Sequence, residues 1–415
     1  MREQAVRLFD AAVKAADPAL ALRPQLVDLP KISGKYVLIS LGKAACAMME
    51  EAIANLPKEA TFEAIAVTNY ENAREIERCV VMPAGHPVPD ENGEKAGRAV
   101  ILLLEKTTSK DTVLVLVSGG GSALLPAPVD GVSLEDKAEV SSILLGAGVD
   151  ITEMNLVRQQ LSKLKGGSMA RLAIPAKVRG FMLSDVIGDD LRVIASGPTV
   201  APIGTGATAL ELLQNLNVFD QMPKSVRAHL MEASPEQMGV AADNILIGSN
   251  GLSLRAMLAV SIGGVIVNDS LIGDVEDAAE FILQSIRDNP AKTLIFGGET
   301  TVKIRGDGRG GRNQELALRV AMLAEHEDFG DWIFLSGGTD GRDGPTDAAG
   351  GIVDKNTVQR IRDAGLDPIA LLENNDSYSA LKAAGDLLMT GATGTNVADV
   401  QVFLRNIKVL KNNFR

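Results

Sequence analysis

The feature that most constrains this chain is the way its short apolar runs end in glycine-rich loops. Residues 113–117 run into Ser118, three glycines and Ser122, and two similar junctions follow between Ile295 and Gly350. Glycine costs backbone entropy, so a chain that repeats it where strands end brings its backbone close to something there. Backbone N–H groups in such loops commonly bind anions. The sequence therefore predicts anion-binding loops at strand ends.

The same loops carry charged groups that suit phosphoryl transfer. Phosphoryl transfer depends on placed cations, amide donors and a metal more than on covalent chemistry from the protein. The chain has three His and two Cys, with neither a CxxC pair nor an HExxH motif, so zinc, iron–sulfur and cysteine-nucleophile chemistry are poorly supported. The charged residues of the loops are Glu299, Arg309, Arg312, Asp340, Asp343 and Asp347.

Length and charge limit the class of protein. At 415 residues, 46% of them apolar, the chain is long enough for two or three domains with buried cores. A net charge of −12 argues against a general nucleic-acid or anionic-membrane partner. The segment 1–20 has the pattern of an amphipathic helix rather than a signal peptide, and the chain lacks the run of about 18 apolar residues that a membrane span needs. We expect a cytoplasmic protein.

Apolar runs alternate with helical patterns, which predicts an α/β fold on largely parallel sheets. We place a domain boundary near 234–242, giving a doubly wound N-terminal domain over 1–238 and a second α/β domain over 239–415. Ligands bind outside the carboxyl ends of strands in such sheets, so we expect the active site in a cleft between the domains. Predicted strands are 36–40, 64–68, 80–82, 112–117, 179–183, 244–248, 265–268, 292–296, 332–335 and 400–405, and predicted helices include 44–56, 93–104 and 134–145.

In the N-terminal half, Lys43 lies between a predicted strand and a helix, where its ammonium and the helix N-terminus can face one anion. An exposed first-turn lysine is the alternative. The loop of Ser118, Gly119, Gly120, Gly121 and Ser122 offers consecutive N–H donors but lacks the GxxxxGK[ST] spacing of a P-loop. A tight turn before a proline-rich segment is the alternative for this loop.

Two further segments of that half carry candidates. Asn155, Arg158, Ser162 and Lys165 follow closely, and the last three share one helix face by their spacing, which is typical of either an anion site or a solvated basic face. Asp185 and Asp189 follow a predicted strand, and their hard oxygens suit Mg²⁺, although Asp is also common in turns.

In the C-terminal half, Gly306, Gly308 and Gly311 form a GxGxxG match. A lone match is weak, because the preceding TVKIR alternates like a half-exposed strand, whereas a dinucleotide fingerprint follows a buried parallel strand. We interpret this segment as an anion-binding loop in which the guanidinium groups of Arg309 and Arg312 bind phosphate through pairs of hydrogen bonds. His86, between prolines, is expected to be a structural residue or substrate contact rather than a base.

Six motifs, taken in order, resemble the glycerate 2-kinase family, and the resemblance covers almost the whole chain. The motifs are SGGGSALLPAPVDG, NLVRQQLSKLKGG, SDVIGDDLRVIASGPT, GGETTVKIRGDGRGGRNQELAL, GTDGRDGPTDAAG and TGATGTNVADV. The resemblance implies a Rossmann-like N-terminal domain and a C-terminal domain of the MOFRL type. It also implies transfer of the ATP γ-phosphate to the 2-hydroxyl of D-glycerate, giving 2-phosphoglycerate, with Mg²⁺. Lys43 and Arg312 match the family's catalytic candidates, while Ala392 stands where the pattern has proline.

These motifs contain the remaining site candidates and leave alternatives open. Some relatives are named hydroxypyruvate reductase, so an NAD(P)H-dependent reductase is the alternative enzyme. A non-catalytic sensor is a third class, which the crowding of acids and bases argues against. Expected partners are a nucleotide and glycerate or a related hydroxy acid, with neither nucleic acid nor membrane, and a homodimer is left open. Substrate- or phosphate-binding candidates, besides the Ser118–Ser122 loop, are Asn155, Arg158, Lys165, Ser196, Glu299, Arg309, Asn313, Glu315, Asp340, Asp343, Thr395 and Asn396.

Overall fold

A computed structural model describes residues 1–232 and 241–406. The chain forms two compact units, which we call the Rossmann-like unit (Pro18–Ile247) and the mixed-sheet unit (Met1–Asp17 with Gly248–Arg415). These units differ from the predicted domains 1–238 and 239–415, because the first helix, α1 (Arg2–Ala15), packs with the C-terminal part of the chain. Most of the predicted boundary region lies outside the described residues.

The Rossmann-like unit contains a six-stranded sheet in the order β3-β2-β1-β4-β5-β6. Neighbours from β3 to β5 pair in parallel. This order is that of dinucleotide-binding Rossmann folds, in which the chain reverses direction across the sheet between the first and fourth strands. The strands are β1 (Tyr36–Leu41), β2 (Phe62–Asn69), β3 (Val80–Ala84), β4 (Thr112–Val117), β5 (Lys177–Leu183) and β6 (Ala242–Gly248).

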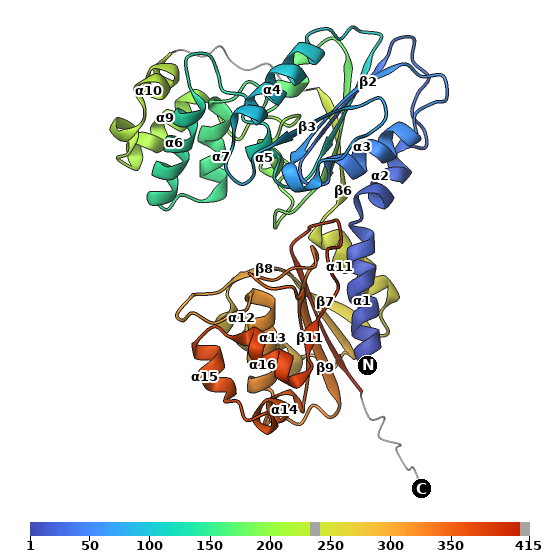
Figure 1. The fold of residues 1–415 in the computed structure, drawn as a ribbon, viewed down its shortest axis with the longest axis vertical. Coiled ribbons are helices and arrows are strands. Elements are labelled where there is room, and N and C mark those ends of the chain that lie inside the picture. Colours follow the sequence, from blue (N-terminus) through green and yellow to red (C-terminus); the bar gives the residue numbers. More distant parts are fainter. Residues whose placement is uncertain (233–240, 407–415) are drawn as a thin grey trace. The chain divides into compact units, whose positions relative to one another are not determined.

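Helices cover this sheet and extend beyond it (Figure 1). α2 (Pro18–Leu26) packs on α3 (Ala45–Ala54), and α3 packs on β1 and β2. α4 (Glu91–Leu104) contributes Val100 and Leu104 to the core that includes Val115 of β4. A second core lies within a group of helices away from the sheet: α6 (Leu134–Gly146), α7 (Ile151–Gln160), α9 (Gly206–Asn215) and α10 (Lys224–Met231). Shorter helices are α5 (Gly121–Leu124), α8 (Ser168–Leu172), η1 (Tyr70–Asn72), η2 (Ile194–Ser196) and η3 (Phe219–Gln221).

The mixed-sheet unit contains a second six-stranded sheet in the order β11-β10-β9-β12-β8-β7. Only β7 and β8 pair in parallel among the described strands of this sheet, so the prediction of a largely parallel second sheet is wrong. The predicted strands are all present, whereas β10 and β11 were not predicted. β8 ends at Thr301, so TVKIR does not continue as a strand. The strands are β7 (Gly264–Asp274), β8 (Thr293–Thr301), β9 (Trp332–Gly338), β10 (Gly350–Asp354), β11 (Leu387–Leu388) and β12 (Asp399–Arg405).

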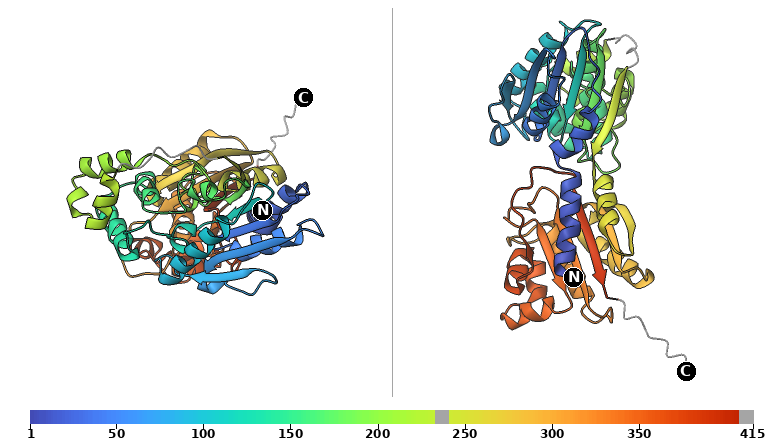
Figure 2. Two further views of the ribbon diagram at one scale, coloured as in Figure 1. Left: turned by 90° about the horizontal axis from the view of Figure 1, so that it is seen from above. Right: turned by 90° about the vertical axis from the view of Figure 1, so that its right-hand side faces the viewer.

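Alternation along the strands separates two layers of core in this unit. Ile295, Leu335 and Val402 face α1 and α11 (Asn250–Val260). Phe296 and Phe334 face the opposite layer, built mainly from α12 and α13. The right-hand view of Figure 2 shows α1 lying along the sheet. The helices of the opposite layer are α12 (Val275–Asp288), α13 (Arg312–Leu323), α14 (Thr357–Asp363), α15 (Pro368–Glu373) and α16 (Ser377–Ala384).

No helix among the described residues combines the length and apolar character required to cross a bilayer.

Candidate active site

The carboxyl edge of the Rossmann-like sheet gathers polar side chains from several strands. Lys43 follows β1, His86 follows β3, Ser118 follows β4 and Asp185 follows β5. Because β1 and β4 are neighbours at the point where the strand order reverses, Lys43 and Ser118 occupy the position where α/β sheets bind ligands. The Lys43 N–H donates to the Gly119 carbonyl at 2.9 Å, and the Ala44 N–H donates to the Ser118 hydroxyl at 3.1 Å. The two loops therefore form one structure.

Each glycine of the Ser118–Ser122 loop allows a close approach. A Cβ on Gly119 would lie 2.1 Å from Asp185 Oδ2, and one on Gly121 would lie 2.5 Å from Leu41 Cδ1. Gly120 has a φ of +87°, and its missing Cβ leaves room for the His86 ring. Among the described residues, none accepts a hydrogen bond from the N–H groups of these three glycines. The loop thus presents consecutive unused amide donors, as its sequence predicts for an anion site.

Beyond this loop, three of the predicted site residues form a hydrogen-bonded chain. The hydroxyls of Ser122 and Ser196 lie 2.6 Å apart, and Ser196 donates to Asn155 Oδ1, also at 2.6 Å. Ala195 and Ser196 both have positive φ values, 48° and 61°. Non-glycine residues in that region are strained and concentrate at functional sites. The structure therefore brings together Ser122, Asn155 and Ser196, which lie far apart in the sequence.

Charges at this edge influence one another. Lys43 is exposed and forms no ion pair with any described residue. Burial and then the charge of Lys43 lower the pKa of His86, so its imidazole is neutral at pH 7. Burial raises the pKa of Asp185, although the hydrogen bond from its own N–H and the charge of Lys43 oppose this effect. The edge consequently holds an exposed cation beside a neutral imidazole and a half-buried carboxyl group.

The basic motif after Asn155 is arranged differently from its prediction. α7 ends at Gln160, so Arg158, Ser162 and Lys165 do not share one helix face, and that interpretation is wrong. Ser162 donates to the Pro126 carbonyl, which is a structural contact. Arg158 and Lys165 instead line one cavity of about 360 Å³ together with Ser122.

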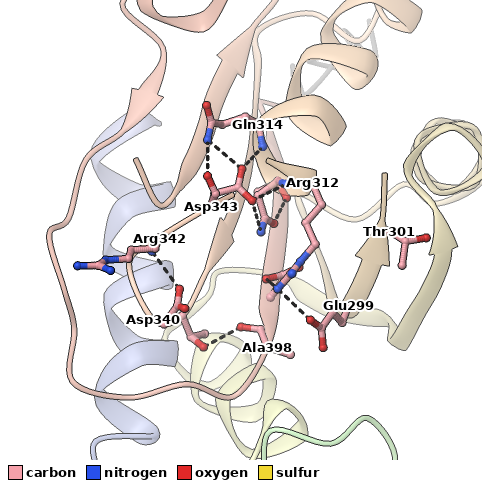
Figure 3. A network of polar contacts seen from close by, with 12 residues as sticks. Glu299, Thr301, Arg312, Gln314, Asp340, Arg342, Asp343 and Ala398 are labelled. Carbon is pink, nitrogen blue, oxygen red and sulfur yellow. Dashed lines mark hydrogen bonds and ion pairs between the residues drawn. The ribbon is translucent and has the colours of Figure 1, made fainter. Parts of the chain in front are cut away.

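In the mixed-sheet unit, polar groups gather where β8 and β9 end and the antiparallel β12 begins. Arg312, at the start of α13, binds Asp399 through two hydrogen bonds of 2.6 and 3.0 Å and lies 3.2 Å from Glu299 (Figure 3). The Asp399 side chain is fully buried, whereas that of Arg312 is 34% exposed. Burial alone lowers the pKa of Arg312, but its bonds to Asp399 and the surrounding carboxylates outweigh burial and raise that pKa. Arg312 is therefore permanently charged and firmly held.

Asp343 caps α13. Its carboxylate accepts hydrogen bonds from the N–H groups of Asn313 at 3.1 Å and Gln314 at 2.8 Å, and from the Gln314 side chain (Figure 3). Burial raises the pKa of Asp343 to about 6, against these hydrogen bonds and with the help of the Asp399 charge. Two N–H groups in the first turn of α13, those of Asn313 and Gln314, are thus already satisfied by the protein. Asp343 is placed to support this helix end.

The glycines of the GxGxxG match are explained by packing within the unit. A Cβ on Gly306 would lie 2.1 Å from Asn374 Oδ1, and one on Gly308 would lie 2.4 Å from the Asn374 carbonyl oxygen. Arg309 lies over the Tyr378 ring, 5.0 Å from its centre, and lines a cavity of about 320 Å³ with Arg342. These contacts favour a self-packed loop over a dinucleotide fingerprint.

The remaining candidates of the mixed-sheet unit make local contacts. Asp340 accepts from the Arg342 N–H, and Asn396 accepts from the Ala398 N–H. Buried Asn313 accepts from Ser336, buried Glu315 pairs with Arg319, and Thr395 donates to the Ala16 carbonyl. Their roles in binding stay predictions.

No group of three or more His, Cys, Asp or Glu among the described residues is arranged to hold a metal by itself. Asp189 has a φ of 54°, and its Oδ1 is buried and receives no hydrogen bond from the described residues. Mg²⁺ commonly uses one or two carboxylates together with water and substrate phosphates. The side chains of Asp185 and Asp189 fit that donor set.

Sequence reasoning missed residues whose importance depends on distant partners. Asp399 lies within the motif TGATGTNVADV, but its pairing with Arg312 joins positions 87 residues apart. Lys137 lines the same cavity as Arg158 and was not singled out, because its position in α6 gives no sign of burial. Only the fold brings these groups together.

Known protein families match the two parts of this chain. A family described as a domain of unknown function (DUF4147) matches residues 4–231, and the MOFRL family matches 292–399. The D-glycerate 2-kinase of Thermotoga maritima is 39% identical, with 97% of this chain and 98% of that protein covered. The chain belongs to the glycerate 2-kinase family. As a member of that family, it is a kinase-type enzyme.

Two further comparisons bear on the fold and on the alternative function. The crystal structure of a glycerate kinase from Thermotoga maritima superimposes with a TM-score of 0.90 at 39% identity, covering 97% of this chain and 99% of that one. A protein of Agrobacterium vitis, provisionally named a hydroxypyruvate reductase, is also 39% identical, with 96% of this chain and 93% of that protein covered. The two-domain α/β architecture is confirmed, and both names expected for relatives occur.

Proposed function

We propose that this protein transfers the γ-phosphoryl group of ATP to the 2-hydroxyl of D-glycerate, giving 2-phosphoglycerate and ADP. The observation that carries the proposal is a relative named D-glycerate 2-kinase, 39% identical over nearly the full length of both chains. The unused amide donors of the Ser118–Ser122 loop, beside Lys43 at the reversal point of the strand order, support it from the geometry.

Charge stabilisation is the main task of the protein in this reaction. The 2-oxygen of glycerate forms a bond to the γ-phosphorus, the bond from that phosphorus to the β–γ bridging oxygen breaks, and the hydroxyl proton is released. We assign Lys43 and Arg312 to neutralise the charge on the moving group. The amides of Gly119, Gly120 and Gly121 contact phosphate or substrate oxygens. That residues of both units serve one reaction stays a prediction.

We also propose that Asp185, together with Asp189, contacts the Mg²⁺ that accompanies ATP. The argument is the donor set, namely the half-buried carboxyl group of Asp185 beside the loop and the buried Oδ1 of Asp189, which receives no hydrogen bond from the described residues. When bound, Mg²⁺ neutralises phosphate charge. The protein groups hold and orient the phosphates around it.

The test is a coupled assay with ATP and D-glycerate, in which enolase reports the product. A signal without added phosphoglycerate mutase is expected, because enolase accepts the 2-phosphate directly. A signal that depends on added mutase would assign the product as 3-phosphoglycerate and contradict the proposed position. L-glycerate serves as the control for acceptor stereochemistry.

Two arms address the alternatives. NADH and hydroxypyruvate are mixed with the protein, and nicotinamide absorbance is followed; oxidation of NADH at a rate comparable to kinase turnover would favour the reductase. Ligand binding without ATP consumption would favour a sensor.

We further propose a cytoplasmic location. Sedimentation of the purified chain decides between a monomer and a homodimer.

A further inference from the structure

Among the described residues, the cavity beside the Ser118–Ser122 loop is lined by three cationic side chains and by no acidic one. It lies wholly within the Rossmann-like unit and has a volume of about 360 Å³, within the range of small-molecule sites. Its charged lining residues are Lys137 of α6, Arg158 of α7 and Lys165. Neither Asp nor Glu lines it, and none of these three cations forms an ion pair with a described residue.

The cations of this cavity are held by neutral oxygen atoms. Lys137 donates to the carbonyls of Pro126 at 2.7 Å and Leu161 at 3.0 Å. Lys165 donates to the Ser122 carbonyl at 2.8 Å, and Arg158 reaches the Ser141 hydroxyl at 3.2 Å. An ammonium has three donors, so both lysines retain N–H groups for another acceptor. The contacts orient the cations and leave their charge uncompensated.

Burying charges in this way is costly, so a structural role alone accounts for it poorly. Lys137 is 9% exposed and Lys165 is 5% exposed. Buried charges are normally paired, because desolvation opposes them. Here burial, followed by the neighbouring positive charges, lowers the pKa of both lysines, to about 7 for Lys137. Burial and the neighbouring positive charges therefore disfavour protonation of the two lysines, and a bound anion would favour it.

The rest of the lining indicates a ligand with an apolar part. Val140 and Leu161 are buried in the wall, while Val88 and Leu145 also line the cavity and are 70% and 65% exposed. Ser122 also lines the cavity, and its hydroxyl lies 2.6 Å from that of Ser196, so the cavity adjoins the hydrogen-bonded chain at the glycine-rich loop. Cationic and apolar surfaces therefore meet beside the predicted phosphate loop.

We infer that this cavity binds the anionic group, phosphate or carboxylate, of a substrate through Lys137, Arg158 and Lys165. The inference rests on the proposed function only for the identity of the two candidate anions, the triphosphate of ATP and the carboxylate of glycerate. Lys137 is a binding residue that the motifs did not indicate. The alternative role, a structural link between α6 and the two carbonyls, predicts altered stability and unaltered binding.

The experiment measures binding without turnover, by calorimetry on the full chain. The probes are a non-hydrolysable ATP analogue, D-glycerate and inorganic tripolyphosphate, each titrated separately. In Lys137→Met the dissociation constant of one substrate probe is expected to rise by roughly tenfold or more, which corresponds to losing a hydrogen bond to a charged group. The probe that loses affinity identifies the anion as nucleotide phosphate or acceptor carboxylate.

A second variant keeps the test decisive if Lys137→Met fails to fold. Ser141→Asp places a carboxylate beside Arg158, supplying the missing acid from the protein itself. It is expected to keep or raise the melting temperature and to weaken the same probe. Lys163→Met is the matched control, because Lys163 is 38% exposed and pairs with Asp130 outside the cavity. Its binding constants are expected to match the wild type.

The outcomes separate this inference from the proposed function. Unchanged dissociation constants for all probes in folded Lys137→Met and Ser141→Asp would overturn the cavity assignment, even if the wild type phosphorylates glycerate. Weakened probe binding in both variants would support the assignment, even if glycerate proved not to be the acceptor. An equal loss in Lys163→Met would also overturn it, since that loss would show a general charge effect.

Discussion

The two units use positive charge in opposite ways. In the mixed-sheet unit, Arg312 is bound by the buried carboxylate of Asp399 and flanked by Glu299. In the Rossmann-like unit, Lys137 and Lys165 donate to carbonyl oxygens, and no acid stands among the described residues of the cavity lining. A cation already paired with protein acids is fixed in position, whereas an unpaired one is prepared for an anion that the protein does not supply.

Replacing Arg312 is expected to have the largest effect, because it acts on both catalysis and stability. We expect Arg312→Met to lower turnover by ~10³ through lost stabilisation of the moving phosphoryl group. It should also destabilise the unit by about 3 kcal/mol, since Asp399 is left buried and unpaired. Coupled kinase assays and urea unfolding measure the two quantities.

The control is Arg362→Met, whose exposed pair with Glu325 should leave both quantities unchanged. Unaltered stability in Arg312→Met would break the comparison, because it would show that the paired arginine is not needed to hold Asp399.

Replacing Lys43 tests the same catalytic assignment without the structural effect. Lys43→Met is expected to lower turnover by ~10³ while the melting temperature stays at the wild-type value, because the side chain is exposed and unpaired among the described residues. The measurements are steady-state kinetics and thermal melts. Lys58→Met, another exposed lysine of the same unit, is the control. Near-normal turnover in folded Lys43→Met would remove Lys43 from catalysis.

The unpaired cations predict a distinctive dependence of stability on pH. The folded pKa of Lys137 is about 7, against a usual value of 10.5. Between these values the unfolded chain binds more protons than the folded one, so the contribution of Lys137 to stability rises with pH. Below pH 7 both states are protonated, and the folded chain bears the full cost of the buried charge.

Lys137→Met removes this contribution. The melting temperature of the variant relative to the wild type should therefore be most favourable below pH 7 and should decline by several degrees toward pH 10. Melts across that range measure it. A difference that does not vary with pH would mean that Lys137 is solvated in the folded chain.

The smallest expected effect comes from weakening the N-terminal cap of α6, the helix that carries Lys137. Ser133 caps α6, with its hydroxyl accepting from the Asp136 N–H at 3.0 Å and the Asp136 side chain accepting from the Ser133 N–H. Ser133→Ala is expected to destabilise the chain by about 1 kcal/mol without changing substrate binding. Urea unfolding measures the change, and Ser109→Ala, an exposed turn serine, serves as the control.

Local sequence patterns predicted those strands whose own residues form a clear apolar run. Apolar runs such as 112–117 became fully buried strands, and glycine-rich junctions marked the ligand-binding edge. The direction of strand pairing in the mixed-sheet unit was not predictable, because β12 contacts both β8 and β9 after a long intervening chain. β10 and β11 were missed, since one begins with two glycines and the other has two residues.

The candidate site was predictable in part for the same reason. The Ser118–Ser122 loop and Lys43 follow their strands directly, so sequence places them at one edge. Arg158 and Lys165 were identified as candidates, but on a helix face that ends before Lys165. Lys137 could not be identified, because its burial depends on carbonyls of Pro126 and Leu161 that belong to other segments.

The membership of α1 in the mixed-sheet unit has a consequence for synthesis on the ribosome. α1 packs on α11, β9 and β12, all of which are translated after the whole Rossmann-like unit. α1 is therefore synthesised before the elements that it packs on, and Leu8 and Phe9 lack their eventual partners until those elements follow. A nascent chain stalled after residue 247 should thus engage hydrophobic-binding chaperones through its first turns of helix, and release should follow completion of β12.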